Sequence, residues 1–455
     1  MKHLRLLCAL LAFSFASLFA QSNPLPLLYQ LSPPSVVPNH PNFSLSVQGT
    51  GFVPGATVLW NNKPLITTFV SSSLLKAIVT GQPSPRSAAI TVENPKGSAS
   101  NVIYFLVRMP SSTIPLALDP SPIEAGVPTV ADFNGDGAPD ILIDGAYHEG
   151  TYYIDTYLGD WEGGFSRVKG QRANFPAMVE WPNPVGDFNH DGKMDVALAS
   201  GINETPVTQI YFGDGTGKVR GANIRGVDGT GAAADMNGDG ELDFVTNVFD
   251  GSFTYLNLYV ESQNSYQWAG GATLGEGLLA GSPVVGDFNN DGKLDVVMTG
   301  ENIVRVFLGN GDGTVQPEVD YAVPSAHMVS AIADLNGDGN LDIVTNGACV
   351  LLGNGDGTFT QGHCGWGITY PYGSLVVADF NGDGKLDVAT IDESSSLLIL
   401  LGFGDGTWAL PITFDLSQAG TGWGNSTFGV ADFNDDGKLD FVIGGITSSV
   451  VLLQR

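Results

Sequence analysis

Cysteine, histidine and basic residues are scarce in this chain of 455 residues. It has 3 Cys and 6 His, and its 19 Lys and Arg stand against 47 Asp and Glu, which gives a formal net charge of −28. This acidic excess disfavours a nucleic-acid partner, because phosphate backbones are bound by basic surfaces. The small number of Cys and His also disfavours zinc or copper sites, which use those ligands.

Long apolar runs are missing after the first 20 residues, so no transmembrane segment is expected. Residues 1–20 begin with basic side chains and continue as an apolar run from Leu6 to Phe19, a pattern typical of a secretory signal peptide. We therefore expect a secreted or extracytoplasmic protein, at a cell surface or in a periplasm. Export permits disulfides. Cys349 and Cys364 flank a predicted hairpin, and a bridge and two buried thiols both remain open.

Catalytic motifs are lacking as well. The sequence contains no Gly-x-Ser-x-Gly nucleophile elbow and no His-Glu-x-x-His zinc motif. Paired carboxylates of the kind that glycosidases use are abundant, but a repeated acidic loop accounts for them better. We therefore expect no enzyme activity and no catalytic residues.

That acidic loop is the most abundant feature of the chain. The string Asp-x-Asn-x-Asp-Gly-x-x-Asp occurs seven times, with starts about 45–55 residues apart. Oxygen-bearing side chains at positions 1, 3, 5 and 9, around a Gly that permits a sharp turn, suit Ca²⁺, which takes six to eight oxygen ligands. The predicted ligands are Asp132, Asn134, Asp136, Asp140, Asp187, Asn189, Asp191, Asp195, Asp235, Asn237, Asp239, Asp243, Asp287, Asn289, Asp291, Asp295, Asp334, Asn336, Asp338, Asp342, Asp379, Asn381, Asp383, Asp387, Asp432, Asn434, Asp436 and Asp440.

Two other interpretations of the loop deserve comparison. An EF-hand needs a Glu at position 12 and flanking helices, whereas position 12 is never acidic here and the flanks, such as Leu294–Met298, are short apolar runs typical of strands. A plain turn is also compatible with Asp, Asn and Gly. Seven copies with three acids each favour metal binding, so the sequence predicts up to seven Ca²⁺.

The repeat also predicts an architecture. A period of this length indicates a solenoid, a propeller or an array. Each repeat has a strand before the loop, two strands after it, a Gly-rich turn such as Gly309–Thr314, and a fourth strand, and four strands make one propeller blade. The last repeat stops at Arg455, on its third strand, so we expect Thr113–Leu118 to supply the missing strand and close the ring. The expected fold is all-β, a seven-bladed β-propeller over residues 110–455.

The repeats resemble a known family. The pattern Val-x-Asp-Phe-Asn-Gly-Asp-Gly-Lys-Leu-Asp, as at Val377–Asp387, resembles the FG-GAP/VCBS repeats of integrin α-type propellers. The resemblance implies that each loop binds Ca²⁺ between the first two strands of its blade. Residues 22–108 lack the loop and contain short alternating strands with Pro and Gly. They resemble an IPT/TIG immunoglobulin-like domain, so we expect a small β-sandwich there, with Trp60 in its core.

Aromatic residues occur in the segments that we expect to join one blade to the next. They are Trp181, Trp268, Trp366, Tyr370, Tyr372 and Trp423. Such segments lie on the propeller face opposite the loops, where rings can stack on sugars or anchor a protein, and packing between blades is the other interpretation. The expected ligand residues are Trp181, Trp366, Tyr370, Tyr372 and Trp423.

These features together predict a function. We expect a non-enzymatic binding or adhesion module for a glycan or an extracellular protein. Two alternatives stay open, because one fold serves many functions. The first is a polysaccharide-acting, lyase-like enzyme on the same propeller, and the second is a structural surface protein without a specific ligand.

Overall fold

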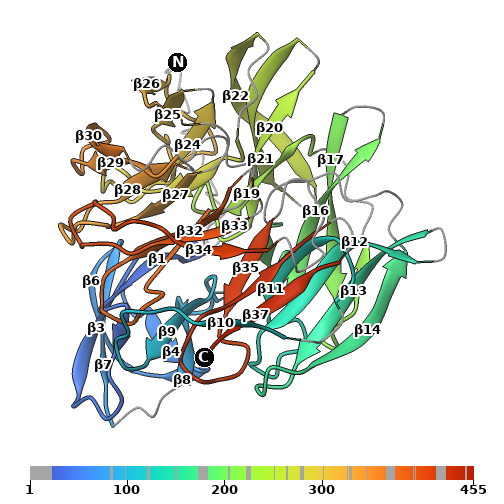
Figure 1. Cartoon of the computed structure of the whole chain (residues 1–455). Coiled ribbons are helices and arrows are strands. Elements are labelled where there is room, and N and C mark those ends of the chain that lie inside the picture. The colour runs from blue at the N-terminus through green and yellow to red at the C-terminus, as the bar shows by residue number, and fades with distance from the viewer. Residues whose placement is uncertain are drawn as a thin grey trace, which may run out of the picture.

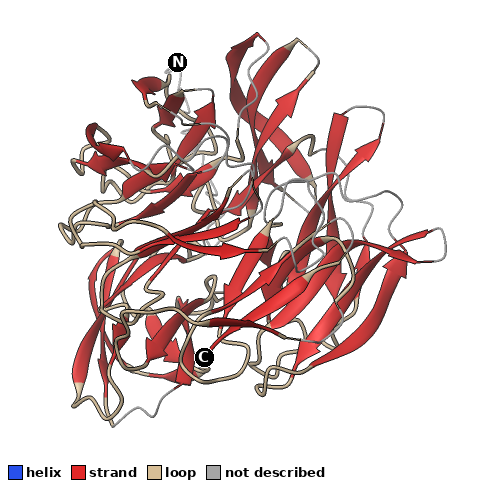
Figure 2. Ribbon diagram, viewed as in Figure 1, coloured by secondary structure: helices blue, strands red, loops and turns tan. Residues whose placement is uncertain are grey.

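The protein is described by a computed structural model. It describes residues 23–81, 86–97, 99–119, 123–148, 151–172, 183–202, 205–221, 227–250, 252–262, 265–276, 281–300, 302–324, 326, 330–345, 347–364, 375–392, 394, 396–416, 427–445 and 448–455. All regular elements in these residues are β-strands (Figure 2). Accordingly, the described part of the chain contains no helix of a length and apolarity that would cross a membrane.

Residues 27–107 form two packed sheets, which we call the sandwich. One sheet has the order β1-β3-β7-β6 and the other β2-β9-β8-β4-β5. The strands are β1 (Leu27–Ser32), β2 (Ser35–Val36), β3 (Phe43–Thr50), β4 (Thr57–Trp60), β5 (Lys63–Pro64), β6 (Ile66–Ser71), β7 (Leu74–Val79), β8 (Arg86–Glu93) and β9 (Ile103–Val107). Apolar residues alternate along these strands and face the space between the sheets, as the period of two in a strand requires.

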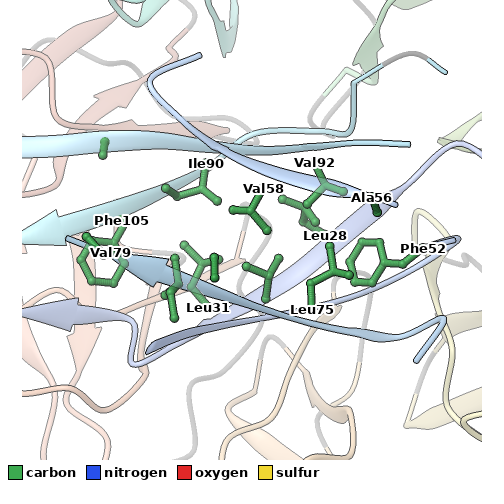
Figure 3. Packing of buried hydrophobic residues seen from close by; sticks show 14 of the residues in the cluster. Leu28, Leu31, Phe52, Ala56, Val58, Leu75, Val79, Ile90, Val92 and Phe105 are labelled. Carbon is green, nitrogen blue, oxygen red and sulfur yellow. The ribbon is translucent and has the colours of Figure 1, made fainter. Parts of the chain in front are cut away.

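A single apolar core holds the sandwich together. Figure 3 shows Leu28, Leu75 and Phe105 among the side chains that meet between the two sheets. The Trp60 ring packs against this core and lies 5.2 Å from the ring of Phe105. The expectation that Trp60 contributes to the core is therefore confirmed.

The described residues between 116 and 454 form seven four-stranded sheets, which we call repeat sheets 1 to 7. Sheets 1 to 3 contain β11 (Val127–Ala131), β12 (Asp140–His148), β13 (Thr151–Gly159), β14 (Phe165–Arg172); β15 (Val185–Gly186), β16 (Asp195–Ile202), β17 (Thr205–Gly213), β18 (Val219–Gly221); and β19 (Thr230–Ala234), β20 (Asp243–Phe249), β21 (Phe253–Glu261), β22 (Tyr266–Glu276). Sheets 4 and 5 contain β23 (Val284–Gly286), β24 (Asp295–Gly300), β25 (Ile303–Phe307), β26 (Val319–Ala322); and β27 (Ser330–Ala333), β28 (Asp342–Thr345), β29 (Cys349–Gly353), β30 (Phe359–Cys364). Sheet 6 contains β31 (Leu375–Ala378), β32 (Asp387–Ile391), β33 (Ser396–Leu400) and β34 (Ile412–Asp415), and sheet 7 contains β35 (Phe428–Ala431), β36 (Asp440–Ile443), β37 (Val450–Gln454) and β10 (Leu116–Leu118).

The acidic loop sets the register of the first two strands in every repeat sheet. The residue before position 1 pairs with the Asp at position 9, as in Ala131 with Asp140 and Gly286 with Asp295. That preceding residue is Ala or Gly in all seven copies. A Cβ on Gly286 would come within 2.7 Å of Ile332 in the next repeat sheet. The small residue thus lets the inner strands of neighbouring sheets approach each other.

The repeat sheets follow one another in a closed circle. Each apolar cluster outside the sandwich joins two successive sheets, and one of them joins sheet 7 to sheet 1 through Phe433 and Ile141. Figure 1 shows this succession by colour, with the red strand β35 lying beside β11. Among the described residues, each repeat sheet therefore buries its two faces against two neighbouring sheets.

The Gly-rich turns connect the third and fourth strands, as the sequence predicts. They also contact the neighbouring repeat sheet, since the amide of Gly357 donates to the carbonyl of Phe288 at 3.1 Å and that of Gly217 to Phe133 at 3.3 Å. The equivalent turn of sheet 1 reaches sheet 7, where Gly163 donates to Phe433 at 3.2 Å. In sheet 5 the strands on either side of such a turn are joined by the Cys349–Cys364 disulfide.

The first and last strands of the circle belong to one sheet. Strand β10 pairs with the C-terminal strand β37, with Ala117 opposite Leu453. The amide of Arg455 donates to the carbonyl of Pro115 and that of Asp119 to Val451, both at 2.9 Å. The predicted closure through the segment Thr113–Leu118 is confirmed.

We expect the substitution Ala117→Pro to destabilise the protein by opening this closure. The backbone groups of Pro115 and Asp119 bond to β37. Because alternate residues of a strand face the same neighbouring strand, the N–H of Ala117 also faces β37. A proline at this position has no N–H to donate. The loss of a paired backbone donor should lower the free energy of unfolding by about 1–3 kcal/mol, measured by urea denaturation. Leu118→Pro is the matched control, because that N–H faces away from β37 and its side chain is 50% exposed. Equal losses in both variants would contradict the closure.

Candidate metal loops

The seven acidic loops, numbered 1 to 7 from Asp132 to Asp432, occupy equivalent places. Each connects the first and second strands of one repeat sheet, so all seven lie at the same end of the circle, which we call the loop face. The structure therefore places the predicted ligand residues of each repeat on one loop, and all seven loops on one face.

Backbone conformation explains why each loop needs its residue types. The Gly at position 6 has a positive φ in all seven loops, between 79° and 93°, a region that glycine enters without strain. Position 4 also has a positive φ, and it is Gly in four loops and His190, Asn290 and Asp435 in the others. Asn, Asp and His are the non-glycine residues that tolerate this region best.

The carboxylate at position 1 organises the loop backbone. In loop 1 the Oδ1 of Asp132 accepts the amides of Gly135 at 2.7 Å and Asp136 at 3.2 Å, and its Oδ2 accepts the amide of Gly137 at 2.8 Å. The bond from position 6 recurs in every loop at 2.8–2.9 Å. The loop backbone thus wraps around the carboxylate at position 1, which accepts its amides.

The side-chain oxygens of positions 3 and 5 also accept backbone amides of the same turn. In loop 1 the Oδ1 of Asn134 accepts the amide of Asp136 at 2.9 Å, and the Oδ1 of Asp136 accepts the amide of Ala138 at 2.8 Å. Both bonds occur in all seven loops. The side-chain oxygens are therefore held by the loop itself.

The Asp at position 9 links the loop to the third strand of its sheet. Its side chain is fully buried in all seven copies. In loop 4 the Oδ2 of Asp295 accepts the amide of Phe288 at 2.8 Å, and its Oδ1 accepts the amide of Gly309, at the end of the third strand, at 2.8 Å. The other six copies make the same two bonds. This residue, predicted as a ligand, thus also has a structural role that the sequence did not reveal.

Burial makes the negative charge at position 9 unfavourable. Burial is the main cause that raises the pKa of these carboxyl groups, and the acids at positions 1 and 5 raise it further. The pKa rises to about 6 for Asp195, to about 7 for Asp140, Asp295 and Asp342, and to about 8 for Asp243, Asp387 and Asp440. Three acids in each loop therefore share a region where a nearby positive charge would be favourable.

The donor set of each loop fits a hard cation by chemical type, because carboxylate, amide and carbonyl oxygens are the ligands that Ca²⁺ takes. The carboxylates point toward backbone amides, and within the described ranges no three or more His, Cys, Asp or Glu side chains form a group able to hold a metal ion. Residues at positions 1, 3 and 5 would hold the ion, and a bound Ca²⁺ would supply the positive charge that these acids lack.

The sandwich lies on the loop face. The backbone amide of Leu25 donates to Asp235 of loop 3 at 2.8 Å, and the Ser35 hydroxyl donates to Asp379 of loop 6 at 2.5 Å. Charge supports this contact: residues 23–108 contain five Lys and Arg and one Glu, whereas residues 109–455 contain 12 Lys and Arg and 46 Asp and Glu. The sequence analysis predicted neither of these two contacts. The excess of Lys and Arg over Glu in residues 23–108 is the signal that would have indicated that this segment lies against the acidic loops.

Arg108 was also missed by the sequence analysis. Its side chain is buried at 3% exposure, and its Nη1 donates to the carbonyl of Phe380 at 2.9 Å and to the Gln454 side chain at 3.3 Å. Burial lowers the pKa of the Arg108 guanidinium, while the carboxylate of Asp379 and other acids oppose that effect. Arg108 thus connects the end of the sandwich to repeat sheets 6 and 7.

Of the aromatic residues expected in the segments that join the blades, only Trp268 lies within the described residues. Trp181, Trp366, Tyr370, Tyr372 and Trp423 lie outside the described residues. Trp268, which we expected in a segment between two blades, lies instead within the outer strand β22. Its ring is 64% exposed and its Nε1 donates to Asn257 at 3.4 Å. The prediction for Trp268 was wrong because strand β22 spans Tyr266–Glu276 and so includes this residue.

Part of the chain matches a family of repeats. The family of FG-GAP-like repeats matches residues 187–246, 235–298, 287–345 and 379–443. Each match begins at position 1 of an acidic loop and ends in the second strand of a repeat sheet. No curated protein sequence matches the chain.

A search of solved structures finds weak similarity to several proteins. The BP39L lectin from Burkholderia pseudomallei has 15% identity and a TM-score of 0.47, with 72% of this chain and 99% of the lectin covered. An Agrocybe aegerita lectin that recognises non-reducing terminal N-acetylglucosamine has 16% identity and a TM-score of 0.45 over 86% and 100%. The periplasmic gluconolactonase PpgL of Pseudomonas aeruginosa has 15% identity and a TM-score of 0.43 over 73% and 93%. Similarity at this level carries no inference about ligand or chemistry.

We expect Asp295→Asn to destabilise repeat sheet 4. The new amide group would face one of the two backbone N–H donors, Phe288 or Gly309, so one buried bond would be lost. The free energy of unfolding should fall by about 1–3 kcal/mol, measured by urea denaturation without divalent cations. Asp312→Asn is the control, because Asp312 lies in an exposed turn, where such changes stay within about 0.5 kcal/mol. A larger effect at Asp312 would refute the structural role of position 9.

Proposed function

We propose that this chain, a β-propeller built of FG-GAP-like repeats, is an exported calcium-binding protein that binds a glycan or an extracellular protein without catalysing a reaction. In this proposal the seven repeat sheets are the blades of a seven-bladed propeller, and residues 22–108 are an immunoglobulin-like domain of the IPT/TIG type. The closed circle of shared apolar clusters supports the first assignment, and the two-sheet sandwich supports the second.

The observation that carries the calcium proposal is the identical construction of the seven loops. All seven place two carboxylates and one amide oxygen at positions 1, 3 and 5 of one turn, beside a third carboxylate at position 9 that is buried. A turn alone needs only the position-1 acceptor and the two residues with positive φ. Burial, and after it the acids at positions 1 and 5, raise the pKa of the position-9 carboxyl group, so the repetition of this set of acids is best explained by a bound positive charge.

The position of the sandwich indicates which face would receive a ligand. It covers much of the loop face, and the cavity between the sandwich and repeat sheets 5 to 7, lined by Tyr29, Tyr104 and Asp379 among others, has a volume of about 100 Å³. Pockets for small-molecule ligands are typically about 300–1,000 Å³. This cavity between the sandwich and the repeat sheets therefore offers little room for a sugar.

The opposite face remains for the ligand. In a four-stranded antiparallel sheet whose first connection lies on the loop face, the fourth strand ends on the other face. The segments between β14 and β15, β30 and β31, and β34 and β35 begin there, and they contain Trp181, Trp366, Tyr370, Tyr372 and Trp423 in sequence. Aromatic rings provide stacking surface for sugars and anchors for proteins, which makes these segments the proposed ligand site.

We expect Ca²⁺ to stabilise the protein and to bind in multiple copies. A site filled at 100 times its dissociation constant adds about 2.7 kcal/mol, so the thermal midpoint should fall in chelator and recover with Ca²⁺ but poorly with Mg²⁺. Metal analysis after equilibrium dialysis should give up to seven Ca²⁺ per chain, and Asp287→Ala should remove one. A melting curve that does not respond to chelator would contradict the calcium proposal.

We expect the double variant Trp366→Ala/Trp423→Ala to lose ligand binding on a glycan array while its calcium-dependent melting stays unchanged. The matched control is Trp268→Ala, because that exposed ring lies on the outer strand of a repeat sheet. The same glycans should be tested for turnover. Binding without product formation supports the proposal, product formation would instead establish a polysaccharide-acting enzyme, and the absence of both would leave a structural surface protein.

A further inference from the structure

We propose that the sandwich is a fixed shield over loops 3 to 7, so that the seven loops fall into five shielded and two open sites. Combined with the calcium binding proposed above, on which this part rests, the shield makes cation exchange slow at loops 3 to 7 and fast at loops 1 and 2. The shield itself is a property of the protein without metal and can be tested separately.

Polar groups of the sandwich and of the segment just before it bind directly to the loops at three places. Leu25 donates its amide to the position-1 carboxylate of loop 3 at 2.8 Å, and Ser35 donates its hydroxyl to that of loop 6 at 2.5 Å. In loop 5 the Gln30 side chain makes two bonds to the backbone of Asp334, accepting its N–H at 2.6 Å and donating to its carbonyl at 3.2 Å. These bonds involve the residues at position 1, where a cation would be held.

Loops 4 and 7 are covered by close backbone approach. The Thr50 hydroxyl donates to the carbonyl of Gly292 in loop 4 at 3.4 Å, and a Cβ on Gly292 would lie 3.1 Å from the Ser72 hydroxyl. A Cβ on Gly437 in loop 7 would come within 2.5 Å of the carbonyl of Val107. Position 6 of both loops therefore lies directly against the sandwich, and in loop 7 only a glycine fits.

Apolar contacts fix the sandwich in this position. Tyr29 packs against the apolar clusters that join repeat sheet 4 to its two neighbours, and Tyr104 packs against the cluster of sheets 7 and 1. Leu106 is a buried member of the cluster between sheets 6 and 7. The hydroxyl groups of Tyr29 and Tyr104 are buried, and burial raises their pKa. Because the sandwich shares cores with the repeat sheets, its contact with the loops is part of the fold.

The exposure of the residue at position 1 also separates loops 3 to 7 from loops 1 and 2. In loops 3 to 7 the residue at position 1 is at most 8% exposed. The exposed fractions are 8% for Asp235, 4% for Asp287, 7% for Asp334, 2% for Asp379 and 0% for Asp432. Asp132 and Asp187 in loops 1 and 2 are only partly buried. Solvent therefore reaches the position-1 carboxylate in loops 1 and 2, where a cation would be held.

Shielding changes the rate at which a cation can leave. A hydrated ion needs a path to bulk water, and at loops 3 to 7 that path requires local opening of the sandwich contact. At loops 1 and 2 the ion leaves directly. Loss of the polar contacts should therefore accelerate release from the shielded loops and leave release from the open loops unchanged.

The first test measures Ca²⁺ release from the full chain into an excess of fluorescent chelator in a stopped-flow instrument. The parent protein should release two Ca²⁺ in a fast phase and five in a slow phase. The variant Gln30→Ala/Ser35→Ala, which removes the side-chain bonds to loops 5 and 6, should accelerate part of the slow phase by on the order of tenfold. The control Thr68→Ala, on the outer edge strand β6, should leave both phases unchanged.

The second test needs no metal. Chelator-treated, desalted protein is labelled with a carbodiimide and an amine, which convert accessible carboxylates to amides, and the products are mapped by mass spectrometry. Asp132 and Asp187 should be labelled, whereas Asp235, Asp379 and Asp432 should be protected. Equal labelling of all loops overturns the shield even if calcium binds. Protection of these three Asp together with an absence of bound Ca²⁺ upholds the shield and refutes the calcium proposal.

A single release phase for all bound Ca²⁺ also overturns the division into two classes of loop. The same conclusion follows if the double variant releases Ca²⁺ at the parent's rates while its melting curve shows that it is folded. A measured stoichiometry accompanies the kinetics, so that the number of ions in each phase is known.

Discussion

The buried carboxylate at position 9 of each loop is the interaction on which the repeat sheets depend. Its two oxygens accept amides from the loop and from the end of the third strand, as Asp440 does with Phe433 and Gln454. One side chain thereby sets the start of the second strand and ties the third strand to the loop. Burying a carboxyl group without such partners is unfavourable by several kcal/mol, so the two amide bonds and the Asp are required together. Seven repetitions of this link give seven sheets of the same construction.

Closure of the circle is the second constraint. Each repeat sheet buries its faces against two neighbours, and the apolar cluster of Phe433 and Ile141 completes the set between the last sheet and the first. The chain ends meet in one sheet through β10 and β37, and the turn amide of Gly163 contacts Phe433 across the same junction. An open sheet edge or an uncovered face at this junction would expose unpaired backbone groups and apolar surface to water.

The loop face and the sandwich depend on each other. The repeat sheets gather acids at one end, and the sandwich brings a positive balance of charge and several hydrogen-bond donors to the same end. Arg108 extends between repeat sheets 6 and 7 from the last residues of the sandwich. The position-1 residues of the loops therefore differ in their access to solvent although the loop sequences are nearly the same.

The sequence by itself determined the local structure. The spacing of Asp, Asn and Gly predicts seven loops with strands on either side, and the missing last strand predicts closure through residues near Ile114. These features follow from patterns in which the interacting residues are close in the sequence or repeated. Only the tertiary structure decided the role of position 9, because its second partner is a backbone amide 11 to 19 residues away. It alone also decided which loops are shielded, since Leu25 acts through its backbone N–H and Gln30 and Ser35 are ordinary polar residues. Backbone groups are the same at every residue, so contacts made through them leave no pattern in the sequence.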